Sequence, residues 1–549
     1  MLTRQPEPAE TTPAAAKPVS AQTGKMARTV VSVWLSFLVF SFWQAPIPAV
    51  NEPHWLAKAQ HYWQPDWCAG DFFLTSSNTH LVFYQTVGAL TTMFSFELTA
   101  LIGRILGYLL LAIGWVSLCH SATGRQETAL PAAWLFLLLA SIGNLSGEWL
   151  VSGIEGKVFS YAFMFLSLAR LGESDWLRAG LYGGLGIAFH PLIGIWFVIA
   201  VGMAIAIAAV VPGRDRLNMY DLSAAIRHPM AMAGLAILIG VALFGIVPAL
   251  QAIGGTSPQV TFTATYLQVF YRLGHHLDPM EFEFRRYGMY LLMALAVWLL
   301  IHTGERHSQA AWLGRAVLAS GIIAAVGWLV GLRDSSIVEV ELPKRMPLYK
   351  LRATLLKFYP FRLVDVFLPV VLAMLIARHA VTRLSHFYPT TLKAGFVVAV
   401  LATLWLSAGR GSNNHMEAQQ EADWLEACEW IRRNTPEDAL VHTPHQTWAF
   451  KWFAHRAEYV AIKDCPQDAA GIVEWNDRQL GIRAWANDPD IYADRLYSRA
   501  ETEKLSREKG ITHLLVQRGK LGPFEVEGLF TNSTYRVYRI SPESSSPRK

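Results

Sequence analysis

Uncharged apolar stretches recur along most of this chain. The first extends from Val30 to Val50 without a charged residue, and similar stretches follow as far as Ser407. A helix needs about 20 mostly apolar residues to cross the hydrocarbon core of a bilayer. Charged residues make up only 16% of the chain, whereas soluble domains carry about 25%. These features predict a mainly α-helical, polytopic membrane protein.

About eleven crossings are expected, and several are shorter than a full span. His190-Pro191 separates two of them, and because proline interrupts the helical hydrogen-bond ladder, this pair is either two crossings or one kinked helix. The apolar segment from His80 to Phe96 is short and fits an interfacial helix or a re-entrant segment. The predicted crossings lie near residues 29–47, 97–118, 129–146, 156–171, 177–190, 191–211, 230–252, 287–302, 311–332, 361–378 and 391–408.

The positions of Lys and Arg orient these crossings, because short basic loops stay on the cytoplasmic side of a membrane. Residues 1–28, which we interpret as a disordered tail, would then be cytoplasmic. The helical domain of residues 29–411 would lie in the cytoplasmic (inner) membrane, with the remaining residues outside the cytoplasm. The cytoplasmic loops would be those with Arg125, Arg170/Arg178, Arg214/Arg216/Arg227, Arg306/Arg315 and Arg378/Arg383/Lys393.

One basic loop does not follow this rule. Residues 333–360 fall on the outer side, although they carry Arg333, Lys344, Arg345, Lys350, Arg352 and Lys357. A bound anionic lipid head group or phosphate would explain their charge. An error in the number of crossings would explain it equally well.

Residues 412–549 are polar and predict a small α/β domain. Cys428 and Cys465 both lie in it, and their pairing in a disulfide is left open. Helices are expected at Glu421–Asn434, Gln446–His455 and Ala469–Ala484. Strands are expected at Ala439–His442, Glu458–Ile462, Ile511–Gln517, Glu525–Phe530 and Tyr535–Ile540.

Two carboxylates flank the loop after the first crossing. Glu52 follows Asn51, a suitable helix cap, and precedes Pro53, which favours the first turn of a helix; Asp71 ends the same loop. A carboxylate at a bilayer surface can act as a general base or bind a metal. The alternative is a helix cap or a solvated surface group.

A second acidic loop is expected on the same side, with Glu148 and Glu155. Lys157 lies two residues after Glu155, on a different helical face, so local pairing would be poor and a functional role for these residues is favoured. His190 is either a satisfied core histidine or a ligand for substrate. Arg362 either pairs with Asp365, three residues later, or binds a phosphate together with Lys350 and Arg352.

The chain resembles the GT-C-type glycosyltransferases, multi-spanning enzymes that use polyprenyl-phosphate-linked sugars. It is most similar to an uncharacterised bacterial family with GT-C-like features. The resemblance rests on Asn-Glu-Pro-His-Trp, Gly-Asp-Phe-Phe, Glu-Gly-Lys, Phe-His-Pro, Tyr-Pro-Phe-Arg-Leu and Trp-Ile-Arg-Arg-Asn-Thr-Pro, at residues 51–55, 70–73, 155–157, 189–191, 359–363 and 430–436.

This resemblance implies a glycosyltransferase that moves a sugar from a polyprenyl phosphate to an envelope acceptor with inversion. GT-C enzymes usually carry two acids in the first outer loop, and Asn51 replaces the first. It therefore implies a single base, Glu52, with Asp71 as a second catalytic carboxylate and Mg²⁺ or Mn²⁺ as an optional cofactor. Arg352 and Arg362 would stabilise the leaving phosphate. The implied substrate-binding residues are His54, Glu148, Glu155, Lys157, His190, Lys350, Arg352 and Arg362.

Such a site requires that Glu52, Asp71 and Glu155 face one cavity with Arg352 or Arg362. The missing first acid also suits a non-catalytic carrier, flippase or assembly factor for an envelope polysaccharide. An ion-coupled transporter fits less well, because most ionisable residues lie at helix ends. The expected partners are a lipid-linked sugar and membrane lipids, and no basic patch indicates nucleic-acid binding.

Overall fold

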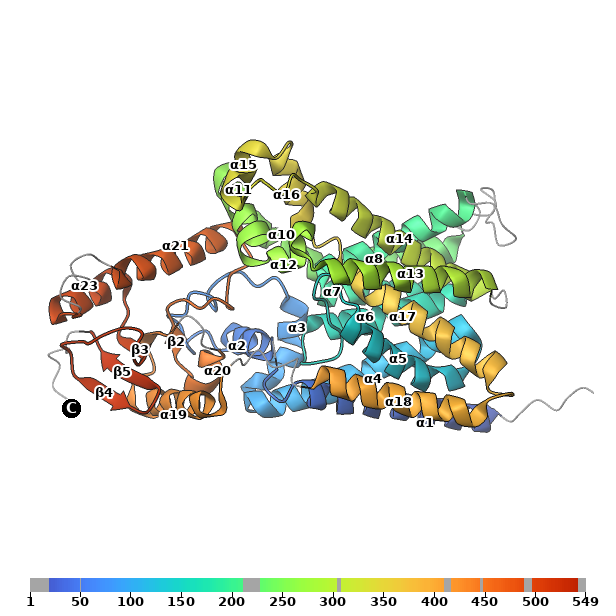
Figure 1. The fold of residues 1–549 in the computed structure, drawn as a ribbon, viewed down its shortest axis with the longest axis horizontal. Coiled ribbons are helices and arrows are strands. Elements are labelled where there is room, and N and C mark those ends of the chain that lie inside the picture. Colours follow the sequence, from blue (N-terminus) through green and yellow to red (C-terminus); the bar gives the residue numbers. More distant parts are fainter. Residues whose placement is uncertain are drawn as a thin grey trace, which may run out of the picture.

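The protein is a bundle of long helices joined at one end to a small α/β domain (Figure 1). This computed structural model describes residues 19–49, 51–210, 228–303, 308–408, 416–444, 448–487 and 496–541. Most of the expected N-terminal tail and the expected domain boundary at residue 411 therefore lie outside the described residues. The predicted fold class, a polytopic helical module with a small C-terminal α/β domain, is confirmed.

Each of the eleven predicted crossings coincides with a helix. Within the described residues eight helices are long and apolar enough to span a membrane, and α5, α6 and α7 are shorter. The helices are α1 (Val19–Gln44), α4 (Phe96–Thr123), α5 (Ala129–Ile142), α6 (Gly156–Gly172), α7 (Trp176–Phe189), α8 (Pro191–Val210), α10 (Pro229–Ile253), α13 (Phe284–Thr303), α14 (Ser308–Gly331), α17 (Arg362–His379) and α18 (Pro389–Ser407).

Two segments were ambiguous in the sequence, and the structure decides the one at His190-Pro191. Helix α7 ends at Phe189 and α8 begins at Pro191, with His190 extended between them, so this pair is two helices and not one kinked helix. The segment after His80, expected as an interfacial helix or a re-entrant segment, forms two short pieces, α3 (Leu81–Gln85) and the 3-10 helix η1 (Val87–Thr92).

Small residues let the helices approach closely, as is common inside membranes. A Cβ atom added at Gly180 of α7 would lie 2.0 Å from the carbonyl oxygen of Gly234 in α10. One added at Gly114 of α4 would lie 2.6 Å from the carbonyl oxygen of Ala162 in α6. These pairs of helices therefore pack backbone against backbone, and larger side chains such as Phe244 and Leu291 are exposed on the outside.

The C-terminal domain is built on a sheet of five strands in the order β2-β1-β3-β5-β4, in which β1 runs parallel to β2 and β3. Strands β3 and β4 are antiparallel to β5. The elements are α19 (Ala418–Asn434), β1 (Leu440–His442), α20 (Phe450–Ala454), β2 (Ala457–Glu458), α21 (Ala469–Ala486), α23 (Arg499–Lys509), β3 (His513–Gln517), β4 (Gly528–Thr531) and β5 (Tyr535–Arg539).

Two predictions for this domain need correction, and one helix was not predicted. The strand expected at residues 458–462 ends at Glu458, because the carbonyls of Tyr459 and Ala461 accept hydrogen bonds from side chains of α21 instead of from a strand. The expected helix at residues 446–455 is shortened to α20. Helix α23 was not expected, although Ser498 and Glu501 form a capping box at its start. The four cysteines are free, so Cys428 and Cys465 form no disulfide.

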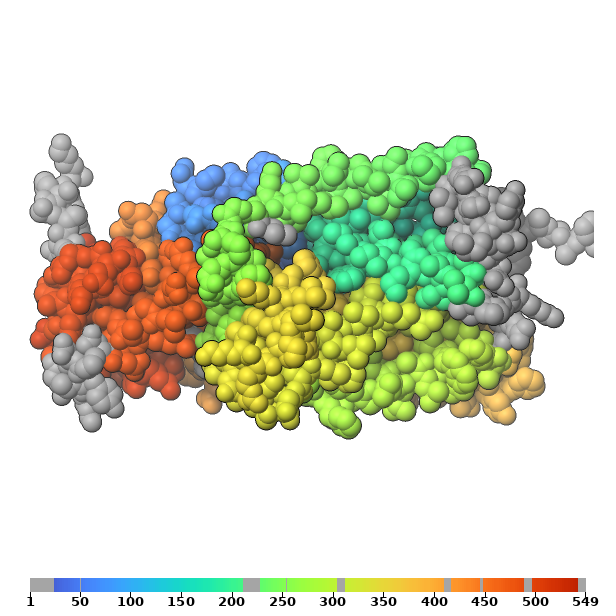
Figure 2. Space-filling model, turned by 90° about the horizontal axis from the view of Figure 1, so that it is seen from above, coloured from blue at the N-terminus to red at the C-terminus, as the bar shows by residue number. Residues whose placement is uncertain are grey.

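The segments predicted to share the outer side meet at the end of the bundle that carries the α/β domain. Helix α2 (Glu52–Trp63) contacts α20, and the start of α17 binds the loop before Ser146. The basic loop, with α15 (Leu342–Arg345) and α16 (Tyr349–Lys357), lies at this end too, because α11 (Pro258–Tyr266) contacts both α16 and α21. Figure 2 shows this loop, in yellow, on the surface beside the C-terminal domain. Its position agrees with a count of eleven crossings.

Candidate functional site

Glu52 forms a fully buried ion pair with Arg104 of α4. Both side chains are 0% exposed, and Nε and Nη2 of Arg104 lie 2.7 and 2.8 Å from the two carboxylate oxygens. The backbone N–H groups of Ala49 and Ile154 donate to the same carboxylate at 2.7 and 2.9 Å. These donors occupy both oxygens, so the geometry supports a structural role that ties three segments together. It does not support the general base expected at Glu52.

Asp71 and His54 belong to a second group of charges, which joins α2 and its following loop to the α/β domain. Lys451 is 3% exposed, and its Nζ lies 2.6 Å from Asp464, 2.9 Å from Glu458 and 3.3 Å from Asp71. His54 Nδ1 lies 2.9 Å from Asp464 Oδ1. We call these five residues the junction network.

The junction network fixes the two parts of the protein against each other. Asp71 also accepts hydrogen bonds from the backbone N–H groups of Leu74 and Glu458, which lie in different parts of the chain. Burial alone would lower the pKa of Lys451, but the three surrounding carboxylates raise it above its usual range. Asp71 is therefore held by the junction network and does not join Glu52, as a shared catalytic site would require.

Glu148, Glu155, Lys157 and Arg362 form a third group, which we call the quartet. Lys157 Nζ lies 2.8 Å from Glu155 and 3.4 Å from Glu148, and Arg362 Nε lies 3.3 Å from Glu148. The quartet gathers the loop before α6, the first turn of α6 and the first residue of α17. Four residues of the predicted substrate-binding set are thus brought together.

Two expected pairings differ from the structure. Glu155 does pair with Lys157, because Glu155 lies in extended backbone before α6 rather than on a helical face. Arg362 does not pair with Asp365, because that carboxylate accepts hydrogen bonds from the backbone of Leu145 and Ser146. Asp365 thereby holds the loop that presents Glu148.

The environment shifts the pKa values of the two carboxylates of the quartet in opposite directions. Burial raises the pKa of Glu148 above its ordinary value, although Lys157 and Arg362 oppose this. For Glu155 burial acts in the same direction, but Lys157 and a 2.9 Å hydrogen bond from Asn51 lower its pKa overall. Glu148 Oε1 is buried, and its contact with Lys157 Nζ, at 3.4 Å, is longer than that of Glu155 Oε1, at 2.8 Å. Such a split between neighbouring carboxylates is typical of acid–base sites.

Two histidines border the quartet. The rings of His80 and His190 lie 5.0 Å apart, and both are buried. Burial lowers the pKa of His80 to about 3, although the charge of Glu155 acts in the opposite direction. His80 is therefore neutral near pH 7. It was missed from the sequence because it stood only at the start of an apolar segment.

Lys350 and Arg352 lie apart from the quartet. Lys350 is exposed, with its Nζ 4.4 Å from the ring centroid of Phe262. Arg352 donates to the carbonyls of Val330 and Leu332 at the end of α14, which is a helix-capping role. Among the contacts of the described residues none joins either side chain to the quartet. Arg362 is thus the arginine of the predicted phosphate site that meets the acidic loop.

A metal does not fit the expected carboxylates. Glu52 is neutralised by Arg104 and Asp71 by Lys451, and they belong to separate groups. In the described segments no cluster of three or more His, Cys, Asp or Glu side chains could hold a metal ion. The two carboxylates of the quartet are likewise balanced by two cations.

Comparisons with known proteins assign no activity. A family described as a domain of unknown function, DUF6798, matches residues 422–482, which contain Lys451, Glu458 and Asp464 of the junction network. No curated protein matches the chain. Among solved structures, the crystal structure of ArnT from Cupriavidus metallidurans in the apo state aligns with 96% of this chain and 99% of its own, at 14% identity and a TM-score of 0.35. A TM-score this low does not establish a shared fold, so the chain stands as a polytopic membrane protein whose C-terminal domain contains a DUF6798 segment.

Proposed function

We propose that the protein is a membrane glycosyltransferase that moves a sugar from a polyprenyl-phosphate donor to an envelope acceptor, and that the quartet is its reaction site. One observation carries the proposal. A buried carboxylate, Glu148, lies 3.4 and 3.3 Å from two cations, Lys157 and Arg362, at the ends of membrane helices. The reaction class comes from the resemblance of the sequence motifs to GT-C enzymes.

In this proposal Glu148 is the general base. Its carboxylate takes the proton from the acceptor hydroxyl, and the hydroxyl oxygen attacks C1 of the sugar with inversion. The bond between C1 and the phosphate oxygen breaks, and the polyprenyl phosphate leaves with the electron pair. Arg362, which is 21% exposed, and Lys157 stabilise the charge on the leaving phosphate. Glu155 holds Lys157 in position.

The proposed reaction takes place at the outer face of the cytoplasmic membrane. The quartet lies at the same end of the bundle as the α/β domain, because Glu155 bonds Asn51 and α2 contacts α20. The opposite end carries basic residues such as Arg125, Arg170 and Arg178, which favours a cytoplasmic location for it.

Purified protein in lipid vesicles, supplied with labelled polyprenyl-phosphate sugars, tests this proposal. Glu148→Gln should lower the transfer rate by about 100-fold or more, the usual contribution of a general base, while donor binding stays intact. Arg362→Gln should weaken donor binding. Arg178→Gln, which removes an exposed arginine that pairs with Asp175, is the matched control. An unchanged rate in the Glu148 variant would refute the assignment.

A non-catalytic lipid-sugar carrier is the second candidate, and the use of Glu52 in a structural ion pair favours it. Such a carrier would bind the donor through Arg362 and Lys157 and release it unchanged. The same vesicles separate the two functions, because a carrier exchanges labelled donor without producing free polyprenyl phosphate.

A further inference from the structure

A cavity of about 390 Å³ opens in the C-terminal domain, and none of its lining residues belongs to the quartet or the junction network. Small-molecule sites commonly have volumes of about 300–1,000 Å³. The cavity is bounded by the end of β1 and the two residues after it (His442–Pro444), by the segment after β2 (Val460–Ile462) and by the C-terminal half of β3 (Leu515–Gln517). Its size and its place in the fold are those of a ligand site.

The sheet topology explains why a cavity forms here. Strand β1 is parallel to both of its neighbours, β2 on one side and β3 on the other. The chain leaves the end of β1 towards β2, and it leaves the end of β3 towards β4 and β5 on the opposite side of the sheet. In parallel sheets, loops that diverge in this way leave a crevice beyond the carboxyl ends of the strands, where ligands bind.

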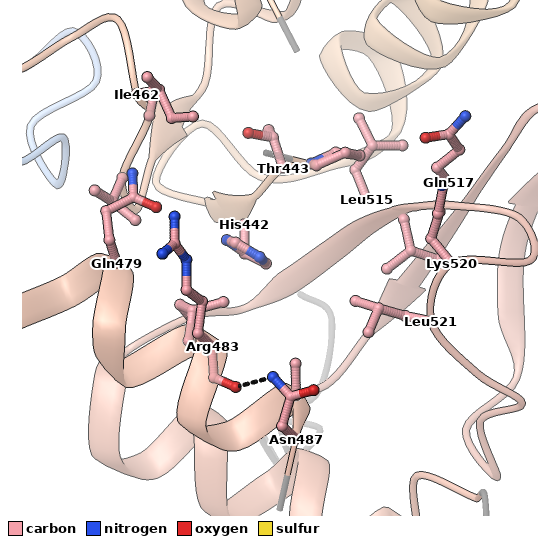
Figure 3. A pocket seen from close by; sticks show the side chains of 16 residues that line it. His442, Thr443, Ile462, Gln479, Arg483, Asn487, Leu515, Gln517, Lys520 and Leu521 are labelled. Carbon is pink, nitrogen blue, oxygen red and sulfur yellow. Dashed lines mark hydrogen bonds between the residues drawn. The ribbon is translucent and has the colours of Figure 1, made fainter. Parts of the chain in front are cut away.

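Polar and basic side chains face the cavity from two sides, beside apolar lining residues such as Ile462 and Leu521. Figure 3 shows Gln479 and Arg483 of α21 on one wall and Gln517 and Lys520 on the opposite wall. Leu515 and Val516 are buried at the base. The described lining contains no Asp or Glu, so the cavity attracts negative charge.

These polar groups are available to a ligand. In the described chain no hydrogen bond or ion pair engages the guanidinium of Arg483 or the Nζ of Lys520. Arg483 can bind a carboxylate or phosphate through two parallel hydrogen bonds. The amides of Gln479 and Gln517 each offer donors and an acceptor, which suits hydroxyl groups.

We propose that this cavity binds a monosaccharide that carries a carboxylate or phosphate group. Arg483 and Lys520 hold the anionic group, and the two glutamines bind sugar hydroxyls. A nucleotide fits less well, because no Phe, Tyr or Trp is among the described lining residues and Thr443-Pro444, rather than a glycine-rich turn, follows β1. The site is separate from the transfer reaction proposed above and does not depend on it.

Isothermal titration calorimetry of the full-length protein in detergent tests the site with glucuronate, glucose 6-phosphate, glucose and inorganic phosphate. At least one of the two anionic sugars should bind about tenfold or more tightly than glucose and phosphate (about 1.4 kcal/mol), since only these sugars offer both a charge-assisted hydrogen bond to Arg483 and hydroxyls to the glutamines. Arg483→Gln should weaken that binding by a similar factor. Arg433→Gln removes another arginine of the domain, 72% exposed and outside the cavity, and should change nothing.

A second variant tests the cavity itself. Ala486→Phe places a ring into the space beside Arg483 and should abolish binding while thermal unfolding of the domain is unchanged. Three results would each overturn the proposal. These are no binding of either anionic sugar, equal binding of phosphate alone (an adventitious anion site), and binding that survives Arg483→Gln.

Discussion

The substitution Glu52→Gln separates the structural role of Glu52 from the catalytic role that its motif implies. It removes one charge of a pair in which both side chains are fully buried. Arg104 then keeps its charge inside the helical module without a counterion. Breaking a buried ion pair in this way costs about 3–5 kcal/mol. The variant should therefore unfold much more readily than the wild type.

Unfolding in detergent by titration with sodium dodecyl sulfate measures this loss. Adding Arg104→Met to Glu52→Gln should recover most of the stability, because the uncompensated charge is gone and the new amide oxygen still accepts a backbone N–H. Glu97→Gln, at an exposed position in the first turn of α4, is the matched control and should cost less than about 1 kcal/mol. A Glu52→Gln protein that is as stable as the wild type but inactive would refute this reasoning and restore Glu52 as the base.

Three further substitutions test other parts of the structure. Lys451→Met should leave Asp71, Glu458 and Asp464 without their shared cation and lower the stability by about 3–5 kcal/mol. Limited proteolysis should then cleave between the helical module and the α/β domain faster, and unchanged protease resistance would contradict a role in docking. Arg352→Gln should lower the free energy of unfolding by about 1–3 kcal/mol, because the helix cap is lost, and should leave the affinity for the donor unchanged. A large loss of donor affinity at unchanged stability would instead favour the phosphate-binding role that the sequence suggested. Burial lowers the pKa of His513 from 6.5 to about 4, so this histidine binds a proton more tightly in the unfolded chain than in the folded protein. The stability present above pH 6.5 should therefore fall by on the order of 3 kcal/mol as the pH approaches 4. Unfolding followed between pH 7 and 4 checks this, because His513→Gln should flatten the profile, and an equally steep profile would contradict it.

The crossings could be predicted from the sequence because each depends on local hydropathy. The eleven predicted crossings, the first starting at residue 29 and the last ending at residue 408, all coincide with helices. Even the short helices α5, α6 and α7 lie where apolar residues are continuous. The prediction of a strand at residues 458–462 was wrong because the structure of this segment depends on tertiary contacts. Its carbonyls accept hydrogen bonds from side chains of α21, which come into reach only when the domain is folded.

The partners of the site residues could not be predicted. Arg104 stands alone in an apolar helix and gave no sign that it would meet Glu52, although a charge in such a helix is usually paired. His54 and Asp464 are 410 residues apart in the sequence. The acidic loop and Arg362 were expected in one site, and they meet in the quartet, whereas Glu52 and Asp71 were separated by partners that local patterns do not reveal.

The release of free polyprenyl phosphate in a single turnover tests the central claim most directly. Excess wild-type protein in vesicles, given labelled polyprenyl-phosphate sugar and an envelope acceptor, should release the lipid phosphate in step with sugar transfer. Glu148→Gln protein should bind the same amount of donor and release almost none. Donor bound by the wild type and returned intact, with no free polyprenyl phosphate, would contradict catalysis at the quartet.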